Sequence, residues 1–179
     1  MLVSLARNSA VVLRVIAACL LGCALGPYAT ARIADRGPST PAERKQALEF
    51  ARHFEADPLN PDLNAEIQWV LKWTMEVPDI RLDLCTSFDK LKFESKDGHL
   101  FFDAMVLAQT GFVLEHPDRK DDGPAQTEAG AEGVLRAYEA SIKANPKDRE
   151  PFLDKLFKQR EAGTLSQFIK QHAPSSCGN

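Results

Sequence analysis

The sequence predicts an all-α protein: an irregular antiparallel bundle of five to seven helices that follows a cleaved signal peptide. Two observations carry this prediction. Apolar residues recur at helical spacing in several separate segments, and prolines preceded by side-chain acceptors mark the ends of those segments. With 179 residues, 44% of them hydrophobic, the chain is long enough to enclose one core.

The N-terminal stretch has the pattern of a signal peptide. Arg7 and Arg14 precede an uncharged run over residues 15–26, which is too short to span a bilayer comfortably. Ala29 and Ala31 then supply the small residues that signal peptidase requires. We therefore expect a signal peptide over residues 1–31, with cleavage after Ala31 and export to the periplasm or the medium.

A second interpretation of the leader is lipidation. Leu20-Leu21-Gly22-Cys23 is similar to a bacterial lipobox, although leucine is a poor residue just before the glycine. Acylation of Cys23 would attach the protein to a membrane, and an uncleaved anchor is a third alternative. Without one of these, no membrane partner is expected.

The remaining chain is expected to form a flexible linker over residues 32–40 and a single α-helical domain over residues 41–179. The leader holds two of the 22 basic residues and none of the 25 acidic ones, so the chain after residue 31 has a net charge of −5. This acidic balance argues against nucleic acid as a partner.

The cysteine count points to one disulfide. Cys19 and Cys23 leave with the leader, so Cys85 and Cys177 are the cysteines that remain. In an oxidising compartment such a pair normally forms a disulfide, and closing so long a loop stabilises a fold by about 4 to 5 kcal/mol. Two unpaired or metal-binding thiols are the alternative.

The helix from Leu63 to Val77 is the expected centre of the bundle. Trp69 and Trp73 lie one turn apart, roughly opposite to an apolar stripe. A helix that is apolar on two sides is normally covered on both. The stripe consists of Leu63, Ile67, Val70, Leu71, Thr74 and Val77.

Two segments before the centre of the chain have clear patterns. Thr40-Pro41-Ala42-Glu43 is a capping box, which predicts a helix that ends at Asp57-Pro58. Ile80 to Cys85 alternates apolar and charged residues, but a lone strand would have nothing to pair with. We expect an extended segment or a short helix that delivers Cys85 to the core, with a minor β element as the remaining alternative. A short helix and a loop are expected over residues 86–98.

The second half of the chain reads as four more segments. His99 to Glu115 is apolar on nearly every side and predicts a buried helix that packs beside the central one. Residues 118–133 are hydrophilic and predict an exposed connection. A helix is expected from near Thr127 to Asn145, another from Asp148 to Gly163, and a short last one from Thr164: these boundaries are marked by Gly, Pro and Asn.

One internal similarity concerns residues 47–58 and 135–146. Phe50 aligns with Tyr138, and each copy ends with a proline that precedes a new helix. This pattern resembles the second helix of a tetratricopeptide hairpin. The spacing of 88 residues does not fit that repeat, so we interpret the similarity as antiparallel helix hairpins and assign no family.

Motifs of catalysis are absent from the sequence. It contains no Gly-rich phosphate loop, no Gly-x-Ser-x-Gly and no His-Glu-x-x-His, and no catalytic residue, metal ligand or cofactor is expected. Asp103 stands in a nearly apolar helix, with His99 four residues earlier. We interpret the two as a local pair at the edge of the core.

Trp69 and Trp73, with Glu66 and Glu76 beside them, form the candidate binding site. Aromatic residues flanked by charges are typical of helix contacts and of peptide grooves alike, and core packing is the simpler interpretation. We expect an exported, non-enzymatic protein that binds a peptide, a protein or an envelope component between helices. The alternatives are a small enzyme or metal-binding protein with a site built from distant residues, and a structural envelope component.

Overall fold

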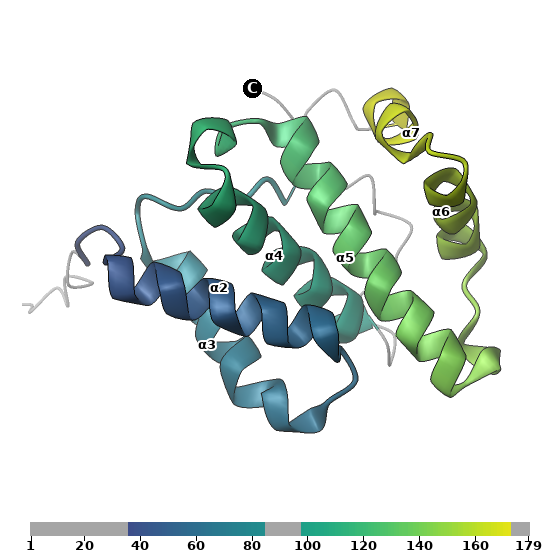
Figure 1. Ribbon diagram of the computed structural model, residues 1–179, viewed down its shortest axis with the longest axis horizontal. Helices are drawn as coiled ribbons and strands as arrows, with labels where there is room; N and C mark the ends of the chain where they lie inside the picture. Colours follow the sequence, from purple (N-terminus) through teal and green to yellow (C-terminus); the bar gives the residue numbers. More distant parts are fainter. Residues whose placement is uncertain (1–35, 85–97, 173–179) are drawn as a thin grey trace, which may run out of the picture. The chain divides into compact units, whose positions relative to one another are not determined.

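The computed structural model describes residues 36–84 and 98–172, and all regular structure in these two stretches is helical, as predicted (Figure 1). The predicted signal peptide, the short helix and loop within 86–98 and the Cys85–Cys177 disulfide lie outside the described residues. None of the described helices is both long enough and apolar enough to cross a membrane. The α-helices are α2 (Pro41–Ala56), α3 (Asn64–Glu76), α4 (Gly98–Glu115), α5 (Gly123–Ala144), α6 (Pro151–Glu161) and α7 (Leu165–His172), and short 3-10 turns cover Pro61–Leu63, Pro117–Arg119 and Pro146–Asp148.

The capping box at the start of α2 is confirmed. The Glu43 N–H donates to the Thr40 hydroxyl at 3.2 Å, and the Thr40 N–H donates to the Glu43 carboxylate at 2.8 Å. Two of the N–H groups that a helix start leaves unpaired are satisfied in this way. The helix expected from Asp148 begins later, at Pro151, because residues 146–148 form a separate turn.

The centre of the bundle is the pair α4 and α5, so the prediction that the Leu63–Val77 helix is central was wrong. Figure 1 shows α4 between α5 on one side and the α2–α3 hairpin on the other. Helix α3 contacts α2 and α4 but buries a single face, and residues such as Gln68 and Met75 are exposed. An amphipathic helix with one covered face belongs at the periphery.

Small residues explain why α5 is central. Gly133 lies so close to α4 that a Cβ there would come within 2.5 Å of the Ala104 carbonyl oxygen, and a Cβ at Gly130 would come within 3.0 Å of Met105. Residues 118–133 were expected to form an exposed connection. Instead α5 already begins at Gly123, and Gly130, Ala131 and Gly133 are buried, because these small residues let the two backbones approach.

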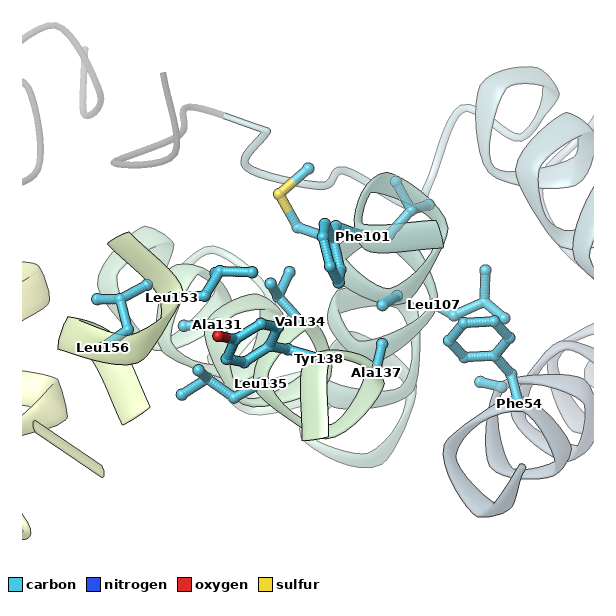
Figure 2. Packing of buried hydrophobic residues seen from close by; sticks show 14 of the residues in the cluster. Phe54, Phe101, Leu107, Ala131, Val134, Leu135, Ala137, Tyr138, Leu153 and Leu156 are labelled. Atoms are coloured by element: carbon cyan, nitrogen blue, oxygen red, sulfur yellow. The ribbon is translucent and has the colours of Figure 1, made fainter. Parts of the chain in front are cut away.

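Tyr138 anchors the contact between α5 and α6. Its ring is fully buried among apolar side chains from α4, α5 and α6 (Figure 2). Its hydroxyl donates to the Asp154 carboxylate at 2.8 Å and accepts the Glu150 N–H at 3.0 Å, so the polar end of this buried residue is satisfied.

The segment after α3 has no regular secondary structure over residues 80–84, so the short helix that was one of the forms expected is not present there. The side-chain amides of two buried glutamines form hydrogen bonds with its backbone, as a neighbouring strand would do in a sheet. Gln126 accepts the Asp83 N–H at 2.7 Å and donates to the Arg81 carbonyl at 3.2 Å, while Gln109 donates to the Asp83 carbonyl at 2.9 Å. Side chains of α4 and α5 therefore replace a sheet partner.

Candidate functional site

The two tryptophans of the chain stack on each other on α3. Their ring centroids are 5.8 Å apart with an interplanar angle of 12°, and Phe50 from α2 meets Trp69 edge-on at 5.5 Å and 88°. Trp73 is 2% exposed, whereas Trp69 is only partly buried. One tryptophan therefore supports the stack from inside and the other forms its outer part.

Trp73 belongs to the core. The prediction that it lies roughly opposite to the buried stripe was therefore wrong. Trp73 packs in a cluster of buried residues with Ala47, Val77, Ile80 and Val113. On a helical wheel Trp73 lies beside Val77, at the edge of the stripe, and an indole is large enough to reach from that edge into the contact with α2. Only Trp69 has surface left for a ligand.

A small pocket of about 160 Å³ lies beside the stacked rings. The guanidinium of Arg36 lines it and bridges two carboxylates: it donates to Glu76 at 3.2 Å and to Glu43. The Lys72 ammonium lies 3.7 Å from Glu76. The pocket is lined by Arg36, Glu43, Trp69, Lys72, Trp73 and Glu76.

The short arm that carries Arg36, residues 36–40, is held in place through Ser39. The Ser39 N–H and hydroxyl each donate to the Asp79 carboxylate at 2.7 Å, and Arg44 donates to it at 2.6 Å. Burial raises the pKa of Asp79, but these hydrogen bonds outweigh that effect and lower it to about 2. The arm is thus anchored to the turn after α3, and Arg36 is held over the pocket.

The pocket combines negative charge with an aromatic wall. The hydrogen bond from the Thr40 N–H lowers the pKa of Glu43, and Arg36 lowers it further, so the carboxylate is charged at neutral pH. The Trp73 indole N–H is buried and has no hydrogen-bond partner in residues 36–84 and 98–172. Indole faces and carboxylates are the groups that bind planar organic cations in proteins.

The structure brings three of the four predicted site residues together. Trp69, Trp73 and Glu76 line the pocket, whereas Glu66 does not: its carboxylate pairs with His53 of α2 at 2.9 Å. Sequence reasoning missed Arg36 and Glu43. Arg36 lies in the stretch expected to be a flexible linker, and Glu43 was explained by its capping role. No sequence signal links either residue to α3.

His99 and Asp103 form no hydrogen-bonded pair. His99 is exposed and acts on Asp103 only as a nearby charge that lowers its pKa. Within the described part of the chain, no three His, Cys, Asp or Glu side chains come together as a metal site would require. The local pair expected at this edge of the core is therefore electrostatic at most.

A second groove runs over α2, α4 and α5 and has a volume of about 230 Å³. Two ion pairs cross it: Arg52 with Glu115, and Arg136 with Glu55 at 2.6 Å. Each pair joins α2 to one of the central helices. These four charged side chains are therefore explained by contacts between helices. Exposed pairs of this kind stabilise a fold by only about 0 to 1 kcal/mol each.

Comparison with known proteins gives no match: no family model and no curated protein matches the sequence, and no solved structure matches the fold. A helical fold alone does not imply a function, which depends on the geometry and chemistry of particular sites.

Proposed function

We propose that this chain is an exported, non-enzymatic binding protein, and that its pocket beside Trp69 binds an arginine side chain of a protein or peptide partner. One observation supports the proposal most: a guanidinium, that of Arg36, already lies between Glu43 and Glu76 next to the stacked indoles. The pocket's own residues thus identify the chemistry it takes.

The chemistry of the guanidinium group explains the choice of arginine over other cations. Its planar fork donates to two carboxylates at once and stacks on aromatic faces, and it is less strongly hydrated than an ammonium. Glu43 and Glu76 are arranged for such a fork, since Arg36 donates to one with each terminal nitrogen. The exposed part of Trp69 offers the aromatic face.

Charge balance favours replacement of Arg36 by a cation from a partner. With Arg36 displaced, two carboxylates and one ammonium, that of Lys72, remain around the pocket. The local charge is then −1, which attracts a cation and repels an anion. The arm competes with any partner, because a tethered group has an effective concentration of about millimolar.

Intrinsic fluorescence tests the proposal directly, because both tryptophans of the chain belong to this pocket. The Arg36→Ala variant removes the internal guanidinium. We expect N-acetyl-arginine amide to change its fluorescence in a saturable way, at least tenfold more tightly than in the wild type. The neutral citrulline analogue, which has nearly the same shape, is expected not to bind.

Two further variants serve as controls. Arg52→Ala removes another exposed arginine that pairs with one carboxylate, away from this pocket, and is expected to behave like the wild type. Glu76→Gln combined with Arg36→Ala should abolish binding. Equal binding of the arginine and citrulline probes, or no binding to Arg36→Ala, would contradict the proposal.

Export is the second part of the proposal and rests on the leader pattern alone. Mass spectrometry of the secreted protein is expected to find Arg32 as the first residue. An acylated Cys23 would place the protein on a membrane instead. Non-reducing peptide mapping should link Cys85 with Cys177, and two alkylatable thiols would refute that disulfide.

A further inference from the structure

A wider hollow of about 440 Å³ lies where the α2–α3 turn faces the first half of α4. Its volume falls in the range of small-molecule sites, about 300 to 1,000 Å³. Most of the lining is apolar: Phe54, Pro58, Leu59, Pro61, Ile67 and Leu100. Leu59 is 41% exposed, one of the few large apolar side chains in the described part of the chain that solvent reaches so freely.

Asp103 is the one ionisable residue of this lining, and Asn60 and Asn64 are its other polar members. No hydrogen bond to the Asp103 carboxylate forms within the described residues, and burial raises its pKa to about 6 although His99 opposes this effect. The lining residues from α2, the 3-10 turn and α3 carry no charge. The neighbouring charge that acts on Asp103 is that of His99, on the same helix. A half-buried carboxylate without a partner is costly to a fold.

We propose that this hollow is a second binding site, which takes a small amphiphilic amine: an ammonium group that pairs with Asp103, carried on an apolar body that covers Leu59 and Leu100. The occupant follows from charge complementarity. An ammonium group pairs with the carboxylate of Asp103. The apolar walls favour burial of a hydrocarbon body, and the lining contains no positively charged group that would attract an anion.

The site is independent of the arginine pocket. The two share no lining residue, and both tryptophans lie outside the hollow. Binding here is therefore expected to leave the tryptophan fluorescence unchanged. A failure of either proposal does not affect the other.

Titration of the ¹⁵N-labelled protein by NMR tests the inference, with n-hexylamine and n-hexanol as the probes. At pH 7.5 we expect the amine to shift the amide resonances of residues 59–67 and 100–103 and to bind at least tenfold more tightly than the alcohol. At pH 5 the carboxylate is mostly protonated, so amine binding should weaken about tenfold while alcohol binding stays constant.

Two variants make the result decisive. Asp103→Asn keeps the shape of the side chain, and because it removes a partly buried charge it should fold normally. In this variant the amine is expected to bind no more tightly than the alcohol. Leu59→Ser should weaken both probes together. Equal affinity of amine and alcohol for the wild type, or amine binding that Asp103→Asn leaves intact, would overturn the proposal.

Discussion

Gly133 of α5 lies directly against the backbone of Ala104 in α4, and a Cβ at position 133 would come within 2.5 Å of the Ala104 carbonyl oxygen and of the Ala108 Cβ. This contact sets how closely the two central helices approach. Both neighbours are parts of the helix that cannot rotate away, so the space cannot be made by a side-chain movement.

We expect Gly133→Ala to lower the free energy of unfolding by about 1 to 3 kcal/mol, because the methyl group must push the helices apart. Gly111 of α4 is the matched control, since a Cβ at that position would meet no neighbouring group within 4 Å. Gly111→Ala should raise stability by about 0.5 to 1 kcal/mol through helix propensity. Urea denaturation followed by circular dichroism measures both, and equal effects of the same sign would refute this account.

The tryptophans should differ in their contributions to stability. Trp73→Ala leaves a cavity in the core and is expected to cost about 3 to 5 kcal/mol, whereas Trp69→Ala, at a partly exposed position, should cost less than half as much. Circular dichroism at 222 nm is the appropriate measurement, since either variant alters fluorescence. A larger loss for Trp69→Ala would show that Trp69 is the core residue.

Gln126 should be essential for holding residues 80–84 against α4 and α5. It is 3% exposed, and Gln126→Ala leaves the Asp83 N–H and the Arg81 carbonyl without their partner. We expect a loss of about 2 to 4 kcal/mol and faster amide exchange at Asp83. Gln68→Ala, at an exposed position of α3, is the control and should change stability by less than about 0.5 kcal/mol. Unchanged exchange at Asp83 would contradict the role of Gln126.

Asp79 should contribute to stability above pH 4 and lose that contribution in acid. Its pKa is lowered to about 2 in the folded protein, so the folded state holds the charged form more strongly than the unfolded chain does. The contribution is expected to be about 1 to 2 kcal/mol, complete above pH 4 and lost as the pH falls through 2. Asp79→Asn should remove this loss of stability in acid.

The same variant should release the arm and raise the affinity for N-acetyl-arginine amide.

Asp103 should act in the opposite direction. Because burial raises its pKa to about 6 in the folded protein, charging it opposes folding: the penalty is absent below pH 4 and complete above pH 6. Asp103→Asn is therefore expected to stabilise the protein by about 1 to 2 kcal/mol at pH 7.5 and by nearly nothing at pH 4. Thermal unfolding at the two pH values measures this difference. A destabilised variant at pH 7.5 would show that the carboxylate has a partner.

Local patterns in the sequence were sufficient for the helices themselves. The capping box at Thr40 and the apolar run after His99 each predict a helix that the structure contains, because these signals act between residues a few positions apart. The alternation over Ile80 to Leu84 left an extended segment and a short helix open, and the structure has no helix there. The partners of this segment, Gln109 and Gln126, come from helices far along the chain and could not be predicted.

The sequence by itself determined that this protein is helical and where most helices begin, since capping and apolar spacing are local properties of the chain. The tertiary structure alone decided which helix is central and which residues share a pocket. Gly133 places α5 against α4 because it lacks a side chain, and the Ser39–Asp79 contact carries Arg36 to Glu76 across 40 residues of sequence. Both depend on the shape and charge of surfaces that meet only after folding, and local periodicity carries no information about them.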